Sequence, residues 1–148
     1  RGLGDVYKRQ GICAWLKEAG LPNVLPPVTI DVVESNWSIE TVDAVFSANT
    51  VHIMSWKNVT EMFTGIGKVL SANGVVCLYG PFNYGGKYTS GSNARFDEWL
   101  KTNNPLSGVR DFESLNELAQ LQGLRLSKDH EMPANNRCLV WCRETQEL

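Results

Sequence analysis

Residues 41–80 read TVDAVFSANTVHIMSWKNVTEMFTGIGKVLSANGVVCLYG, and this stretch decides the fold class. Its first part, Thr41–Ala48, and its last part, Val75–Tyr79, are short, apolar and rich in β-branched residues, which predicts two buried strands. Between them, apolar side chains recur every three or four positions from about Trp56 to Leu70, which predicts a helix. Strands that alternate with helices indicate an α/β sheet that is parallel at least in part.

Two further elements precede this unit. Val28–Val32 is compact and β-branched, so we predict another buried strand there. Apolar residues at helical spacing between positions 12 and 19 predict a short helix, and Gly20 is placed to end it.

Two helices and two strands are predicted after it. Asn73-Gly74 is a strong turn signal just before the strand Val75–Tyr79. Phe96, Trp99 and Leu100 mark a helix for which Ser92 or Asn93 is the expected cap.

Asp111 is the expected cap of the next helix, which ends at Gly123. Leu124–Glu131 and Cys138–Trp141 then read as strands. The link between these last two strands is too short for a parallel crossover, so they form an antiparallel hairpin.

Composition narrows the class of protein. The chain has 148 residues, 43% of them hydrophobic and 20% charged, with a net charge of −2. These values are typical of a globular domain and argue against a nucleic-acid partner. No apolar run approaches the roughly 20 residues that span a bilayer, so we expect no membrane partner. The 4 cysteines form no CxxC pair, which predicts no metal site, reduced structural cysteines and a cytoplasmic location.

Ligands of open α/β sheets bind beyond the carboxyl ends of the strands. In this sequence those ends are Asp31-Val32, Ala48–Thr50 and Tyr79–Phe82. We therefore expect the functional residues in these three places.

Several motifs resemble one family. The sequence is similar to the methyltransferase-like protein 26 group, also called domain of unknown function 938, from about Gly11 to Arg143. The matching motifs are Leu21-Pro22-Asn23, Pro26-Pro27, Asn49 with His52 and Trp56, Tyr79-Gly80-Pro81-Phe82, Ser92-Asn93, Phe96-Asp97, Gly108–Asp111 and Met132–Asn136.

The resemblance implies a Rossmann-like methyltransferase sheet, mostly parallel with a C-terminal antiparallel hairpin, in the strand order 3-2-1-4-5-7-6 of that fold. It also implies S-adenosylmethionine as the cofactor. The expected function is methyl transfer to an unknown small-molecule or protein acceptor.

The resemblance also assigns roles on the cofactor side. Asp31 would accept from the adenine amino group and Val32 would offer backbone groups to the same ring. Asn49 would lie beside the methionine moiety, and His52 would take a proton from the acceptor or orient it. The alternatives are a strand-end carboxylate for Asp31, a turn residue for Asn49, and a histidine bonded to backbone for His52.

On the acceptor side, Tyr79, Pro81 and Phe82 would line a pocket or pack near the sulfonium. Their alternative role is closure of the core. Three amides, Asn93, Asn135 and Asn136, would meet the acceptor, or serve only as turn residues. Arg110-Asp111 is most simply a charge pair and cap at a helix start.

Residues 1–10 do not fit the domain. Asp5–Gln10 resembles the translated end of a transposon that is used as a sequencing adapter; the alternative is a natural basic arm. We interpret residues 1–10 as an adapter artefact, residues 11–143 as the C-terminal two-thirds of a single methyltransferase-like domain, and residues 144–148 as a tail.

This interpretation leaves the first two strands of the domain, with their glycine-rich turn, outside the chain. We therefore expect the chain by itself to be inactive, and unstable at Val28–Val32, because a strand without partners has unpaired backbone groups. A non-catalytic binding or scaffold module is the main rival hypothesis, and a nicotinamide-dependent oxidoreductase is a third.

Overall fold

The structure is a computed structural model that describes residues 3–34 and 36–143. The chain divides into two compact units, Arg1–Asp31 and Val32–Leu148. Among the described residues, no helix is both long enough and apolar enough to cross a membrane.

The first unit contains one helix, α1 (Leu3–Ala19). It ends as predicted at Gly20, which has a φ of +57° and donates its backbone N–H to the Leu16 carbonyl oxygen (3.1 Å).

The strand predicted at residues 28–32 is wrong. These residues belong to no strand of the described structure, and the side chains of Val28 and Ile30 are 64% and 40% exposed. A β-branched run becomes a strand only where a neighbouring strand accepts its hydrogen bonds, and no described strand does so here.

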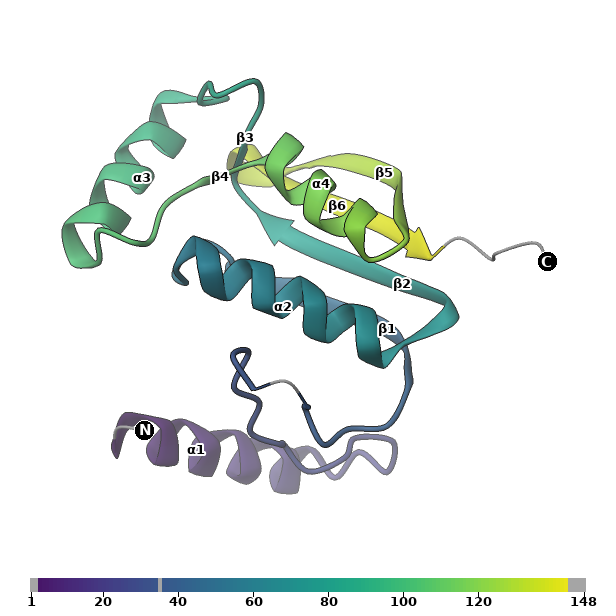
Figure 1. Cartoon of the computed structure of the whole chain (residues 1–148). Helices are drawn as coiled ribbons and strands as arrows, with labels where there is room; N and C mark the ends of the chain where they lie inside the picture. The colour runs from purple at the N-terminus through teal and green to yellow at the C-terminus, as the bar shows by residue number, and fades with distance from the viewer. Residues whose placement is uncertain (1–2, 35, 144–148) are drawn as a thin grey trace. The chain divides into compact units, whose positions relative to one another are not determined.

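The second unit is built on a four-stranded sheet in the order β1-β2-β6-β5 (Figure 1). The strands are β1 (Val42–Ala48), β2 (Leu70–Gly80), β5 (Leu124–Met132) and β6 (Asn136–Arg143). β1 and β2 are parallel, and β6 is antiparallel to both of its neighbours, so only β6 opposes the common direction. This order confirms the expected 4-5-7-6 half of the methyltransferase sheet.

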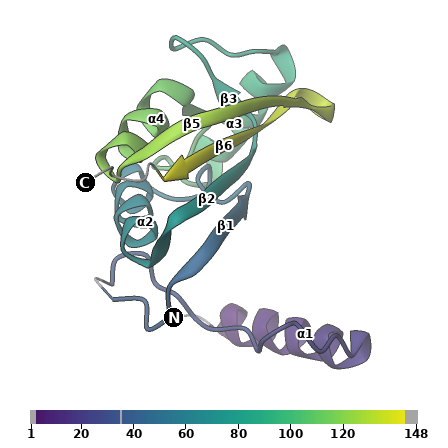
Figure 2. The same cartoon turned by 90° about the vertical axis from the view of Figure 1, so that its right-hand side faces the viewer.

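Two helices, α2 (Trp56–Val69) and α4 (Phe112–Leu121), cover one face of this sheet (Figure 2). Both have an apolar stripe that is buried against alternate residues of β2 and β6. Trp141 of β6 is fully buried there, packs edge-on against Phe63, and donates its indole N–H to Asn116 Oδ1 (2.9 Å). The core therefore lies between this sheet face and the two helices.

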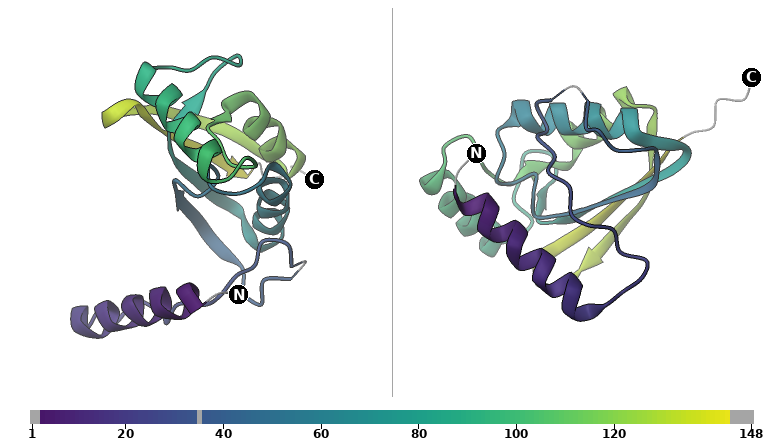
Figure 3. Two further views of the ribbon diagram at one scale, coloured as in Figure 1. Left: turned by 90° about the vertical axis from the view of Figure 1, so that its left-hand side faces the viewer. Right: turned by 90° about the horizontal axis from the view of Figure 1, so that it is seen from below.

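The segment between β2 and α4 lies beyond the carboxyl end of β2 (Figures 1 and 3). It contains α3 (Gly91–Asn103), and a short parallel pair, β3 (Phe82–Asn83) with β4 (Arg110–Asp111), joins its two ends. Three local predictions here and in β2 need correction.

The N-cap of α3 is Ser90, whose Oγ accepts from the Asn93 backbone N–H (3.1 Å), and not Ser92 or Asn93. Asp111 holds the N-cap position of α4 but makes no capping hydrogen bond with its side chain. Asn73-Gly74 lies within β2, where the register against β1 shifts, because the pairing of the two strands already begins at Leu70.

The predicted antiparallel hairpin of β5 and β6 is confirmed. A short turn, η1 (Pro133–Asn135), joins the strands, and Ala134 and Asn135 both have a φ of +59°. This left-handed backbone is unfavourable for alanine and turns the hairpin end toward α3.

Candidate functional site

The carboxyl ends of β1 and β2 meet as predicted. Asn49 follows β1 with a φ of +55°, and its backbone N–H donates to the Tyr79 carbonyl oxygen (2.8 Å). Gly80 ends β2, and a Cβ there would lie 2.5 Å from His52 Nε2 and 3.1 Å from Asn49 Oδ1. Only glycine permits this close approach, so the structure brings Asn49, His52 and Tyr79 together around one backbone position.

His52 is fully buried, with 0% of its surface exposed. Its ring contacts Phe82 and Phe96, with centroid distances of 5.3 and 6.5 Å. Among the described residues, neither imidazole nitrogen has a hydrogen-bond partner. The ring is therefore held by packing, whereas its main chain is tied down: the Gly108 N–H donates to the His52 carbonyl oxygen (2.8 Å).

The surroundings of His52 disfavour its charged form. Burial, reinforced by the positive charge of Arg110, lowers its pKa from 6.5 to about 4, against the opposing effects of the Gly108 backbone and the Asp97 carboxylate. His52 is accordingly neutral at physiological pH.

Arg110 links two loops at this end of the sheet. Its Nε donates to the Val51 carbonyl oxygen (3.1 Å), and its Nη2 donates to the carbonyl oxygens of Leu106 (2.9 Å) and Met54. Its guanidinium also lies 5.9 Å from the centre of the Trp56 ring. Sequence reasoning assigned Arg110 only to a helix start and missed this link. Its place in the Gly108–Asp111 motif was the available signal.

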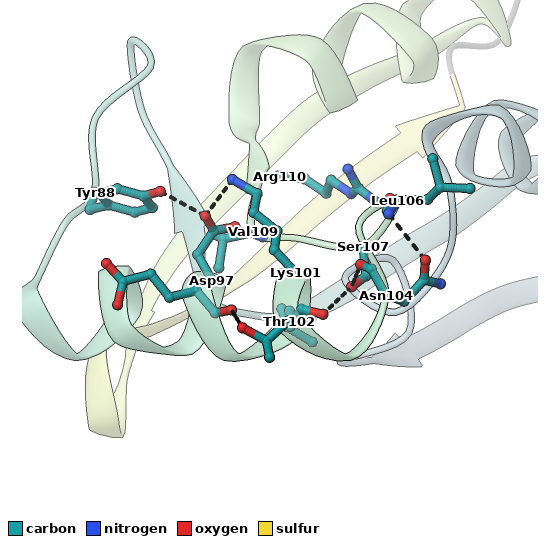
Figure 4. Close-up of polar contacts among 11 residues, drawn as sticks. Tyr88, Asp97, Lys101, Thr102, Asn104, Leu106, Ser107, Val109 and Arg110 are labelled. Carbon is teal, nitrogen blue, oxygen red and sulfur yellow. Dashed lines mark hydrogen bonds and ion pairs between the residues drawn. The ribbon is translucent and has the colours of Figure 1, made fainter.

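Asp97 is a second functional candidate that sequence reasoning missed (Figure 4). Its carboxylate is almost completely buried and accepts from Tyr88 Oη (2.7 Å), Lys101 Nζ (2.6 Å) and the Val109 backbone N–H (2.7 Å). Burial alone would raise its pKa, but the hydrogen bonds from Lys101, Tyr88 and Val109 together hold that pKa below its ordinary value. Asp97 thereby fixes the loop that contacts His52.

The predicted acceptor residues also come together. Buried Asn93, at the start of α3, donates through Nδ2 to Thr89 Oγ1 (2.9 Å) and to the Asn135 carbonyl oxygen (3.1 Å). Asn135 in turn donates through Nδ2 to Ser92 Oγ (3.1 Å). The hairpin turn is thus bonded to the start of α3.

Asn136 connects this turn to β2, because its Nδ2 donates to Tyr79 Oη (3.2 Å). An open polar pocket of about 450 Å³ lies beside these amides. It is lined by Thr89, Glu131, Met132, Ala134, Asn135, Asn136 and Arg137.

Comparison with known families now places the chain. The family described as "Protein of unknown function (DUF938)" matches residues 4–143. The chain belongs to the DUF938 family.

The fold of this DUF938 protein is shared with enzymes of known structure. The chain is similar to the mitomycin 7-O-methyltransferase MmcR, with 15% identity and a TM-score of 0.71. The similarity covers 91% of this chain and 39% of MmcR. For CalO1, a methyltransferase in calicheamicin biosynthesis solved in its SAH-bound form, the coverages are 71% and 31%, the identity 16% and the TM-score 0.59.

A third similar structure is described as a pericyclic reaction enzyme, with coverages of 86% and 33%, 17% identity and a TM-score of 0.64. The DUF938 chain spans well under half the length of each of these proteins. At such identities the likeness shows the fold alone, and it confirms the expected Rossmann-like methyltransferase architecture.

Four predicted residues of this DUF938 protein remain: Asp31, Val32, Pro81 and Phe82. Asp31 is exposed and belongs to the first unit, while Val32 is half-buried and packs against the core of the second. Pro81 and Phe82 are buried, and Phe82 is part of the core. Within the part of the chain that the structure describes, no cluster of three or more acidic, histidine or cysteine side chains could hold a metal ion.

Proposed function

We propose that the full-length DUF938 protein is an S-adenosylmethionine-dependent methyltransferase of the methyltransferase-like protein 26 group. The observation that supports this most directly is the fold shared with MmcR and with CalO1, the latter solved with SAH bound. We also propose a cytoplasmic location, with neither a nucleic acid nor a membrane as partner. Because a fold can host several reactions, the assignment also depends on the residues at the carboxyl ends of the strands.

The polar groups at the end of β1 fit one side of a cofactor site. Asn49 is exposed, and its left-handed backbone holds its amide at the carboxyl edge of the sheet, directly beside Gly80. An amide can donate to and accept from the amino and carboxylate groups of a bound amino acid moiety. We therefore assign Asn49 to the methionine moiety, and Asp31 and Val32 to the adenine ring. When bound, the cofactor supplies an electrophilic methyl group.

The chain's own residues contribute alignment more than proton transfer. A methyl displacement depends mainly on the orientation of its reacting groups. A histidine whose pKa is about 4 is neutral at pH 7 but holds an added proton poorly. The proton-transfer role expected for His52 fits this pKa poorly. Its ring packs beneath Gly80 and its carbonyl oxygen accepts from the Gly108 N–H, so we propose that His52 acts on the acceptor only indirectly, by holding this loop.

The acceptor would lie against the amide cluster. Tyr79, Asn93, Asn135 and Asn136 are joined by hydrogen bonds across β2, α3 and the hairpin turn. We call these four residues the acceptor wall. Their side chains include both hydrogen-bond donors and hydrogen-bond acceptors, which suits a polar methyl-accepting substrate, whether a small molecule or a protein side chain. Pro81 and Phe82 follow Tyr79 in the chain and are buried, and we propose that they line the acceptor site on its core side.

Methyl incorporation tests the proposal. The protein encoded by the complete gene is incubated with methyl-labelled S-adenosylmethionine and separate small-molecule and protein fractions of its host. We expect label in one fraction, and at least about tenfold less with Asn49→Ala, which corresponds to loss of one good hydrogen bond. Glu117→Gln on the exposed side of α4 is the matched control. The 148-residue chain alone should transfer no label.

A non-catalytic module is the second candidate. It is favoured by one observation, the complete burial of His52, which leaves the imidazole at the carboxyl ends of β1 and β2 inaccessible to a methyl acceptor. Cofactor binding without label in either fraction would support this candidate and contradict methyl transfer.

A further inference from the structure

Two cysteine side chains are in direct contact across the sheet. Cys77 of β2 and Cys138 of β6 have their Sγ atoms 3.0 Å apart, and both residues are half-buried free thiols. Cys77 alternates with the buried residues Val76 and Leu78, so it lies on the sheet face opposite α2 and α4. Its register partner in β1 on that face, Phe46, is largely exposed. No described helix of the second unit covers these thiols.

The register explains why these two cysteines meet. Cys77 is opposite Val140, so Cys138 and Cys142 are its two diagonal neighbours on β6. The sulfur contact of Cys77 is with Cys138. Cys138 and Cys142 are about 13 Å apart along one strand, too far to bond to each other. Cys142 is therefore an internal control. Like Cys138, it lies two residues from Val140, the register partner of Cys77, but on the opposite side of it.

We propose that Cys77 and Cys138 form a dithiol site that a small-molecule disulfide, such as oxidised glutathione, converts into an internal disulfide. One cysteine attacks the small disulfide, forms a mixed disulfide and releases one small thiol. The second cysteine then attacks the mixed disulfide and releases the other small thiol. Both S–H protons leave, two electrons pass to the oxidant, and one S–S bond replaces another.

Burial and the neighbouring Cys138 disfavour the Cys77 thiolate: burial, a hydrogen bond with Cys138 and the charge of Cys138 all raise the pKa of Cys77. When Cys138 carries the mixed disulfide, it is no longer a thiolate that accepts from the Cys77 S–H or repels a second negative charge. Cys77 then ionises more readily and attacks the mixed disulfide.

The bond would lie beside the proposed acceptor wall without belonging to it. Cys138 is the register partner of Tyr79. Cys77 and Cys138 are 61 positions apart in the chain, so a bond between them would link distant segments. Oxidation would therefore fix β2 to β6 next to the Tyr79–Asn136 hydrogen bond. This inference does not depend on methyl transfer.

Intact-mass and peptide mass spectrometry of the 148-residue chain test the site. Cys13, an exposed thiol of the first unit, is first replaced by serine. After incubation with oxidised glutathione, the Cys142→Ser variant of this chain, which keeps only Cys77 and Cys138, should lose the mass of two hydrogen atoms, and the chain that retains Cys142 should carry at most one glutathione, on Cys142. Digestion should give one peptide pair that joins Cys77 to Cys138. Cys138→Ser and Cys77→Ser should instead keep glutathione on the remaining thiols.

Two results would overturn the proposal. One is a chain with Cys77 and Cys138 intact that ends with separate glutathione adducts. The other is a Cys138→Ser chain that forms an internal bond as fast as Cys142→Ser does. Peptide mapping of the chain that retains both thiols decides the question even if a serine variant fails to fold.

Discussion

At the scale of single residues, the site is organised by close contacts around one glycine and one histidine. Gly80 lets the imidazole of His52 pack against the end of β2, and the imidazole contacts aromatic rings instead of polar partners. A buried imidazole without hydrogen bonds costs stability when it is neutral and more when it is charged. This cost and the lowered pKa of His52 make the stability of the folded chain sensitive to pH.

The first prediction concerns that sensitivity. The pKa of His52 is about 4 in the folded chain and 6.5 in the reference state, so below pH 6.5 the unfolded chain binds a proton that the folded chain does not. The free energy of unfolding should therefore fall by about 3 kcal/mol between pH 7 and pH 4 from this residue alone. His52→Leu should remove this fall, because leucine binds no proton in either the folded or the unfolded chain.

Urea unfolding at pH 7 and pH 4 measures the effect. His130→Gln is the matched control, because His130 is the second histidine of the chain and is exposed. An unchanged pH dependence in His52→Leu would show that His52 is not the group that titrates.

The second prediction concerns Gly80. In Gly80→Ala, the new methyl group would lie 2.5 Å from His52 Nε2, so we expect a loss of about 2 kcal/mol in the free energy of unfolding. The double variant with His52→Ala should lose less than the sum of the two single losses, because the second change makes room for the methyl group. Gly91→Ala, which meets only ordinary contacts, is the control. Strict additivity in denaturant titrations would rule out the contact.

At the scale of elements, the segment from β3 to β4 is held by side chains more than by its own backbone. β3 and β4 are only two residues long each. Asp97 and Arg110 add side-chain hydrogen bonds from α3 to the loop before β4 and from that loop to the residues after β1, where the Gly108 N–H also donates to the His52 carbonyl oxygen. This arrangement fixes the position of the proposed acceptor wall relative to the sheet.

The third prediction tests that connection. Asp97→Asn keeps the shape of the side chain but removes its charge, and charge-assisted hydrogen bonds contribute about 1.5–3 kcal/mol. The amide of Val109, which donates to Asp97 Oδ1, should exchange with deuterium at least about tenfold faster, as a loss of about 1.4 kcal/mol implies. Glu98→Gln, exposed on the same helix, should leave the rate unchanged.

The same carboxylate makes the segment acid-sensitive. Because the folded-state pKa of Asp97 is held below its ordinary value, its stabilisation is present above that ordinary value and is lost as the pH falls through the folded pKa. If the Val109 amide exchanges equally fast in the unmodified protein and in Asp97→Asn, the role given to Asp97 is contradicted.

The elements that sequence predicts well are those whose signal is local. The β1–α2–β2 unit and the β5–β6 hairpin follow from periodicity and loop length, so their existence and order were predictable. Residues 28–32 have the same β-branched composition, but whether such a run pairs depends on strands elsewhere, which composition does not encode.

The candidate site also contains residues that the sequence indicates and residues that only the folded structure shows. Asn49 and Tyr79 follow from the rule that ligands bind at the carboxyl ends of strands, and the resemblance supplied Asn93, Asn135 and Asn136. The role of Asp97 depends on three donors at separate positions in the chain, and only the folded structure brings them to one carboxylate.

At the scale of the whole molecule, the second unit presents one covered and one uncovered sheet face. Helices α2 and α4 bury one face, whereas Phe46 is largely exposed on the other. β1 is at the edge of the sheet, so its outer backbone groups have no described strand as a partner.

The fourth prediction concerns residues 28–32. Because Val28, Thr29 and Ile30 belong to no strand of the described structure and are exposed, their amides should exchange with deuterium within seconds at neutral pH. The amides of Cys77 and Leu78, in the middle of the sheet, should be protected close to the limit set by global unfolding. Exchange mass spectrometry compares the two segments, and equal protection would show that residues 28–32 pair with a strand after all.

The central claim is that the carboxyl edge of β1 and β2 forms part of an S-adenosylmethionine site. Isothermal titration of SAH into the protein encoded by the complete gene tests it most directly, since it needs no acceptor. We expect one SAH per chain, with binding weakened at least about tenfold by Asn49→Ala and unchanged by Glu117→Gln. Absence of measurable SAH binding, or equal affinity in the Asn49→Ala variant, would contradict the claim.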